Sequence, residues 1–260
     1  MRRPSRRIGL IVPSSNTTME TEIPELLRRH EAEHGTGFTF HSSRARLHNV
    51  DAESLARMVE DSARCAAEVG DAEVDVLAYA CLVAVMAQGT GAHVGIEERL
   101  RGALAGGASA NAPMVSSAGA LVRTFAALGM RRVAVVAPYM PDLTKLVVGY
   151  MEHAGVTVAD SVSLSVSDNC AVGRLDPADL PRHVAGLDIG DVDGIVLSAC
   201  VQMPSLPAVQ QVEDSTGLPV VTAATATTRE ILLALGLPAV VPGAGAALGS
   251  RTPAAAAEAR

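Results

Sequence analysis

Two apolar segments of this chain each open with an aspartate and reach a cysteine a few residues later. The first runs from Asp75 to Met86 and contains Cys81, and the second runs from Asp193 to Met203 and contains Cys200. Short apolar runs of this kind are typical of strands buried on both faces. Hydrophobic residues make up 48% of the chain and aromatic residues only 2%, so the core is built mainly from aliphatic side chains. This combination predicts an α/β fold in which two buried strands each end near a thiol.

The two cysteine segments lie in halves of the chain that resemble each other. Arg7 to Pro13 and Arg131 to Pro138 both consist of a basic residue, an apolar run and a proline, and each proline precedes its cysteine by a similar distance. Strand and helix patterns alternate in both halves, which favours a parallel sheet in each. We therefore predict an internal duplication with two pseudo-symmetric lobes, each a parallel sheet flanked by helices, and an active site between the lobes.

The expected boundaries follow this duplication. The first lobe is expected to comprise residues 1–117 and the second residues 118–222. A helix over 223–236 is expected to pack back on the first lobe, and residues 243–260 are expected to form a disordered tail. Strands are expected at 7–13, 38–42, 75–80, 112–117, 131–138, 156–164, from 194 onward and at 219–222. Helices are expected from the polar cluster 14–18 toward residue 34 and at 52–70, 95–105, 117–128, 142–155, 177–187 and 223–235.

The four cysteines differ in their expected roles. A single cysteine at a strand end is ordinarily a packing residue. The equivalent positions of Cys81 and Cys200 at the carboxyl ends of their strands favour a catalytic pair instead, because ligands bind at those ends of parallel sheets. A helix starting after each cysteine would lower the thiol pKa. Cys65, inside a helix, and Cys170, in a loop, have no such twin and are expected to be inert.

Two polar residues follow the first strands of the halves. Asn16 lies in a cluster of serines and threonines and is first of all a helix cap, but it also presents an amide to an anion. Tyr139 follows the proline of the second half, where its phenol either packs or hydrogen-bonds a carboxylate. The sequence leaves both alternatives open for each residue.

Charge and spacing exclude several classes of function. A net charge of -7 argues against the broad basic face that nucleic-acid binding requires. No apolar run reaches the roughly 18 to 20 residues of a membrane span. No pair of cysteines has the close spacing of a zinc or dithiol site, so no metal site is predicted. The sequence is that expected of a cytoplasmic protein with reduced thiols.

Five segments together identify a family. They are Ile-Gly-Leu-Ile-Val-Pro-Ser-Ser-Asn-Thr-Thr-Met-Glu at 8–20, Ala-Cys-Leu-Val at 80–83, Ala-Pro-Tyr at 137–139, Asp-Asn-Cys-Ala-Val-Gly-Arg-Leu at 168–175 and Ser-Ala-Cys-Val-Gln-Met at 198–203. They resemble maleate cis-trans isomerase, a member of the aspartate/glutamate racemase superfamily that is related to arylmalonate decarboxylase. The likeness runs from about residue 7 to residue 240.

This resemblance implies a cofactor-independent homodimer that encloses a small dicarboxylate between its lobes. Cys81 would be the nucleophile and Cys200 the proton donor in the conversion of maleate to fumarate, with a covalent succinyl-cysteine as the intermediate. The decarboxylases keep a thiol only in the second half, so the presence of both cysteines favours the isomerase. The remaining site residues implied by the resemblance bind the substrate carboxylates through side chains or backbone donors: Asn16, Leu82, Val83, Tyr139 and Asn169.

Two other functions remain open at this point. An amino-acid or hydantoin racemase would use the same two thiols on opposite faces of a stereocentre, one to remove and one to return a proton. A non-catalytic protein could close its two lobes on a dicarboxylate without chemistry. The isomerase predicts fumarate from maleate, whereas the racemase predicts exchange of an α-hydrogen with solvent.

Overall fold

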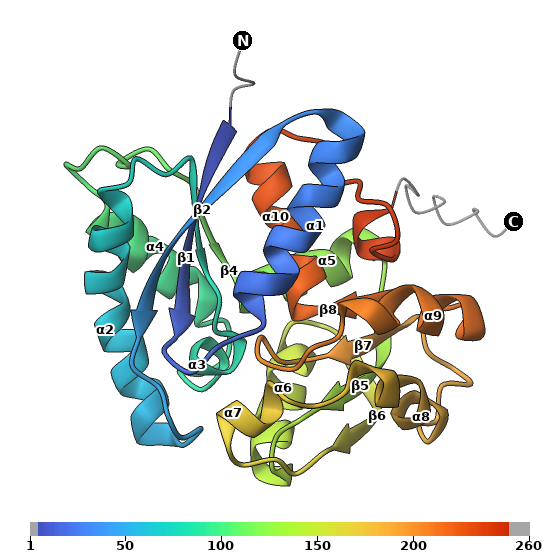
Figure 1. Cartoon of the computed structure of the whole chain (residues 1–260). Helices are drawn as coiled ribbons and strands as arrows, with labels where there is room; N and C mark the ends of the chain where they lie inside the picture. The colour runs from blue at the N-terminus through green and yellow to red at the C-terminus, as the bar shows by residue number, and fades with distance from the viewer. Residues whose placement is uncertain (1–4, 250–260) are drawn as a thin grey trace, which may run out of the picture.

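The computed structural model describes residues 5–249, which form two four-stranded parallel sheets (Figure 1). Corresponding strands of the two halves occupy the same places in the two sheets, which confirms the predicted α/β fold with two pseudo-symmetric lobes. The first sheet has the order β2-β1-β3-β4 and comprises β1 (Ser5–Pro13), β2 (Gly37–Ala45), β3 (Val76–Tyr79) and β4 (Met114–Ser116). The second has the order β6-β5-β7-β8 and comprises β5 (Arg132–Ala137), β6 (Thr157–Ser163), β7 (Gly194–Ser198) and β8 (Val220–Thr222).

Helices connect these strands and cover the sheets. Long helices follow most strands, and a five-residue helix begins directly after Cys81. The helices are α1 (Met19–His34), α2 (Ala52–Gly70), α3 (Leu82–Met86), α4 (His93–Ala103), α5 (Ser117–Leu128), α6 (Pro141–His153), α7 (Asn169–Val172), α8 (Leu180–Ala185), α9 (Leu206–Thr216) and α10 (Ala223–Ala234), with 3-10 turns η1 (Pro177–Asp179) and η2 (Ala246–Leu248).

Helix α2 shows why local sequence determined many of these elements. Asp51 caps its first turn by accepting the N–H of Ser54 at 2.8 Å. Leu55, Met58 and Ala66 lie on one helical face and are buried, as their spacing predicts. The predicted helices at 52–70 and 117–128 are confirmed with these bounds.

Helix α10 links the two halves of the molecule. It follows β8 of the second sheet, yet it packs against α1 and α5 and reaches β3 and β4 of the first sheet. Figure 1 shows α10 between α1 and α5 in the centre of the molecule. The chain therefore returns to the first half after its last strand.

The segment after α10 corrects the predicted tail. Residues 243–249 are ordered: Ala244, Ala247 and Leu248 are buried, and η2 packs on α10, β8 and α5. The N–H of Ala246 is accepted by the Glu213 carboxylate at 2.7 Å. Glycine and alanine richness predicted disorder, but small residues also allow a segment to pack closely on helices. Residues 250–260 of the predicted tail lie outside the described residues.

Three further details differ from the sequence expectations. Cys170 lies in α7 rather than in a loop, and it is exposed. Helix α9 was not expected, and the helix predicted at 177–187 consists of η1 followed by α8. Within residues 5–249 no helix combines the length and apolar character that crossing a membrane requires.

Candidate active site

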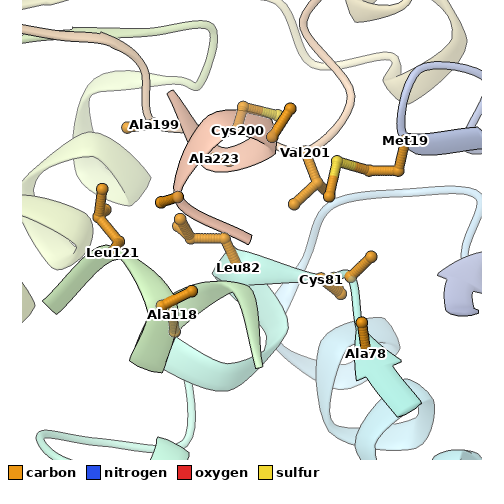
Figure 2. Close-up of a cluster of buried hydrophobic side chains, with 14 of the residues drawn as sticks. Met19, Ala78, Cys81, Leu82, Ala118, Leu121, Ala199, Cys200, Val201 and Ala223 are labelled. Atoms are coloured by element: carbon orange, nitrogen blue, oxygen red, sulfur yellow. The ribbon is translucent and has the colours of Figure 1, made fainter. Parts of the chain in front are cut away.

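The two sheets place Cys81 and Cys200 at equivalent points. Strand β3 ends at Tyr79, two residues before Cys81, and β7 ends at Ser198, two residues before Cys200. Both thiols are almost completely buried, with exposed fractions of 1% and 4%. Figure 2 shows them in one cluster of buried side chains. The duplication therefore brings the two sulfur atoms to the same part of the interior.

Cys81 occupies the start of a helix. It is the N-cap residue of α3, with extended backbone angles of φ -144° and ψ 93°. The N–H groups of Leu82 and Val83 are the first two of that helix, and such groups have no acceptor within the helix. Both residues are buried. The predicted backbone donors are thus adjacent to the first thiol.

Cys200 lies in a loop that leads to α9. The Ser198 hydroxyl donates to the Cys200 carbonyl at 2.9 Å, and the backbone N–H of Gln202 donates to Cys200 Sγ at 3.3 Å. No helix starts directly after Cys200, because α9 begins only at Leu206. The expectation of a helix start beside each thiol is therefore wrong for the second one, where backbone N–H groups of the loop, those of Gln202 and Met203, contact the sulfur instead.

Burial determines the protonation of both thiols. It raises the pKa of Cys81 to about 12, with a further increase from the Cys200 charge and a decrease from the backbone N–H of Ala84. Burial also raises the pKa of Cys200. The Tyr139 hydroxyl and the backbone N–H groups of Gln202 and Met203 lower this pKa, but by less than burial raises it. The prediction of lowered thiol pKa values is wrong for this structure because desolvation outweighs the helix start and the amides.

Tyr139 brings a phenol to the thiols. It lies two residues after β5 and is only 3% exposed. Its hydroxyl has no hydrogen-bond partner of regular geometry among residues 5–249, although it interacts with Cys200. Burial, followed by the charges of Cys200 and Cys81, raises the pKa of Tyr139 well above its ordinary value. A neutral donor is therefore available beside both sulfur atoms.

The two predicted asparagines hold the segments that surround the site. Asn16 Oδ1 accepts the N–H groups of Thr18 and Met19 at 3.1 and 3.0 Å, which caps α1, while its Nδ2 donates to the Val201 carbonyl at 2.9 Å. Asn169 Nδ2 donates to Ser15 Oγ at 2.8 Å. Both asparagines are buried, and their bonds connect the segment between β1 and α1 with the Cys200 loop and with α7.

Gln202 is the residue of this region that sequence reasoning missed. Its side chain joins Ser15, Thr17 and Asn169, and it is 1% exposed. The signal was present, since Gln202 belongs to the segment that carries Cys200, but its type alone does not distinguish a surface glutamine from a buried one.

The chemistry available here is that of two buried thiols and a phenol. Met19, Leu82 and Val201 belong to the same cluster of buried side chains as the thiols (Figure 2). Within residues 5–249 no three His, Cys, Asp or Glu side chains are grouped in a way that could bind a metal ion. A thiol that adds to carbon and a second one that transfers a proton are the reactive groups in this environment.

Fold and site together define a two-lobed α/β protein with one thiol from each lobe. The arylmalonate decarboxylase family model matches residues 8–248. The maleate isomerase of Pseudomonas putida KT2440 is 57% identical over 242 residues, which cover 93% of this chain and 96% of that protein. The chain therefore belongs to the maleate isomerase family, within the wider arylmalonate decarboxylase group.

Solved structures agree with this assignment. The maleate isomerase Iso from Pseudomonas putida S16 has a TM-score of 0.93 and 53% identity, covering 95% of this chain and 99% of that chain. A Nocardia farcinica maleate cis-trans isomerase variant, solved with a covalently bound succinylcysteine intermediate, has a TM-score of 0.91 and 47% identity, covering 95% of this chain and 99% of that chain.

Proposed function

We propose that this protein converts maleate into fumarate without a cofactor, through a covalent succinyl-cysteine. The observation that carries this proposal is the pair of thiols, one from the end of β3 and one from the end of β7, in a single buried cluster. Family membership and the succinylcysteine held by the Nocardia farcinica relative support it. An isomerase must make the central double bond temporarily single, and thiol addition does so.

In the proposed reaction Cys81 first gives up its proton, and its sulfur attacks one alkene carbon. The alkene electron pair moves to the other carbon, which takes a proton from Cys200. Rotation about the new single bond follows, then Cys200 removes the proton again and the carbon–sulfur bond breaks to release fumarate. Because burial favours the neutral thiol, Cys81 has to pass its proton to solvent water as the substrate binds, and it regains a proton from water after fumarate leaves.

We propose that neutral donors bind the substrate carboxylates. Tyr139 offers a hydroxyl that has no hydrogen-bond partner of regular geometry in the described part of the chain, and Leu82 and Val83 offer the N–H groups at the start of α3. Asn16 and Asn169 each have one amide hydrogen beyond the bonds described above. Such donors stabilise the negative charge that develops on a carboxylate when sulfur adds to the alkene.

A proton NMR time course of the purified protein with maleate tests the reaction. Fumarate signals should grow with the wild type and be lost in Cys81→Ser and Cys200→Ser. Mass spectrometry of Cys200→Ser should show the chain plus one maleic acid, attached at Cys81. Unchanged maleate combined with α-hydrogen exchange in an amino acid would instead indicate a racemase, and tight dicarboxylate binding without either reaction would indicate a binding protein.

We further propose a cytoplasmic homodimer, as the family resemblance implies. All four cysteines are free in the structure, which supports a reducing compartment. Light scattering after size exclusion should give twice the mass of the chain, and a monomer mass at micromolar concentration would refute the dimer.

A further inference from the structure

The loop that carries Cys200 is held by the other half of the molecule. The Val201 carbonyl accepts the Asn16 amide at 2.9 Å, and the Gln202 carbonyl accepts the Thr18 hydroxyl at 2.7 Å. Within the loop, the backbone N–H of Gln202 donates to Cys200 Sγ at 3.3 Å. The position of this N–H, and hence its contact with the sulfur, depends on where residue 202 is anchored.

The Gln202 carboxamide provides that anchor through three hydrogen bonds, which use both of its donors and one of its two acceptor positions. Nε2 donates to the Ser15 carbonyl and to the Asn169 carbonyl, both at 3.0 Å, while Oε1 accepts the N–H of Thr17 at 2.9 Å. Ser15 and Thr17 belong to the segment between β1 and α1, and Asn169 begins α7. One buried side chain thus joins three segments that surround the site.

Gly173 leaves room for this side chain. A Cβ at residue 173 would lie 2.6 Å from Gln202 Nε2 and 2.8 Å from Thr17 Oγ1, too close for either atom. The Gly173 backbone has φ -67°, which any residue adopts. The absence of a side chain at 173 is therefore required by the packing of Gln202 and not by the backbone conformation.

We propose that Gln202 is a positioning residue for Cys200. Its carboxamide fixes the loop so that its own N–H stays on the sulfur, where it supports the thiol while a proton leaves and returns. A carboxamide is the group that fits, because it supplies two donors to two carbonyls and one acceptor to an N–H. The role in catalysis rests on the isomerase function proposed above, whereas the role in placing Cys200 does not.

The test compares Gln202→Glu and Gln202→Met with the matched control Gln211→Glu, which lies on the exposed face of α9. The two Gln202 variants should lower kcat for maleate by about 10- to 100-fold with a smaller change in KM, since positioning and not substrate contact is lost. The decrease in kcat caused by Gln202→Glu should become smaller as the pH falls, because a protonated carboxyl regains one donor. The decrease caused by Gln202→Met should not depend on pH in this way.

A second variant leaves Gln202 in place. Gly173→Ala should displace the carboxamide and reproduce part of the kcat loss, while Gly149→Ala, at a position with open space around it, should leave kcat unchanged. Melting temperatures and circular dichroism show whether each variant is folded. Wild-type kcat in Gln202→Met or Gly173→Ala would overturn the proposal.

A readout without substrate separates this proposal from the isomerase function. The rate at which iodoacetamide alkylates Cys200 is measured by peptide mass spectrometry in each variant and divided by the rate in wild type. This ratio should change with pH for Gln202→Glu and stay constant for Gln211→Glu. If wild type fails to convert maleate, the isomerase proposal falls while this ratio still decides the role of Gln202. A ratio near one for both Gln202 variants at every pH would refute the positioning role.

Discussion

Among residues 5–249, Tyr139 combines almost complete burial with a hydroxyl whose one interaction, with Cys200, lacks regular hydrogen-bond geometry. A buried hydroxyl without a partner is unfavourable for folding because it loses its hydrogen bonds to water. Tyr150 provides a contrast, since its hydroxyl lies 2.6 Å from His93 Nδ1 and accepts the His93 N–H at 3.2 Å. This contrast supports the proposed role of the Tyr139 hydroxyl as a donor to the substrate.

We therefore expect Tyr139→Phe to raise the free energy of unfolding by about 1 kcal/mol, because it removes a buried hydroxyl that makes no hydrogen bond of regular geometry. The same change should lower kcat/KM for maleate by about 100-fold, since a donor to the developing charge is lost. Urea unfolding and steady-state kinetics measure the two effects. Tyr150→Phe is the control and should lose stability; a greater loss in Tyr139→Phe than in Tyr150→Phe would contradict this interpretation.

Among the secondary-structure elements, α9 depends on a residue of α1 for its cap. Ser205, its N-cap residue, makes no side-chain cap of its own. Instead Glu22 Oε1 accepts the N–H groups of Ser205 and Leu206 at 2.6 and 2.7 Å. Burial raises the pKa of Glu22 despite these bonds. A carboxylate from one half of the molecule thus fixes the end of the Cys200 loop in the other.

We expect Glu22→Ala to lower the free energy of unfolding by about 2 kcal/mol, because two buried N–H groups lose their acceptor. Glu22→Gln keeps that acceptor and should lose less. A raised folded pKa means that the stabilisation by Glu22 is complete below its ordinary pKa of 4.5 and declines as the pH rises through the folded value. The difference in free energy of unfolding between wild type and Glu22→Gln should therefore shrink between pH 4 and pH 8. Urea unfolding of both proteins at several pH values in this range measures it.

Glu25 supplies a control of opposite sign. Its side-chain bond to Arg29 lowers its pKa, so its contribution is present above pH 4.5 and is lost as the pH falls through the lower folded value. The free energy of unfolding of wild type should therefore increase relative to that of Glu25→Gln as the pH rises. An advantage over Glu22→Gln that also grows with pH would show that the pKa of Glu22 is not raised.

At the scale of the whole molecule, the segment after α10 completes the packing between the halves. His30 and His34 of α1 contact the carbonyls of Pro238 and Val240 through Nε2 at 3.0 and 3.2 Å. The Val241 N–H then donates to the Leu248 carbonyl at 2.7 Å, which closes the segment on itself. The chain between 237 and 249 therefore covers α1 and α10 at once.

Leu248→Ala should lower the free energy of unfolding by about 2 to 4 kcal/mol, since the Leu248 side chain is fully buried and its removal leaves a cavity. Leu233→Ala, at a position on α10 that is 46% exposed, should change stability little. Thermal unfolding of both variants is the measurement. Equal melting temperatures would show that residues 243–249 are disordered, as their composition alone suggested.

Local sequence determined the elements and the pairing of the thiols. The apolar runs ending near Cys81 and Cys200, and the capped helical pattern at 52–70, specify their structures through neighbouring residues, so they could be read directly. The duplication then predicted that both sulfur atoms face the same region, because equivalent strands end at equivalent edges.

Only the tertiary structure decided the environment of those thiols. The raised pKa values arise from burial, which is a property of the folded interior and not of any sequence pattern. The anchors of the Cys200 loop join residues as distant as Ser15 and Gln202, 187 positions apart, and Glu22 and Ser205, 183 positions apart. Such contacts have no periodicity along the chain, so a glutamine or glutamate that makes them looks no different in the sequence from one on the surface.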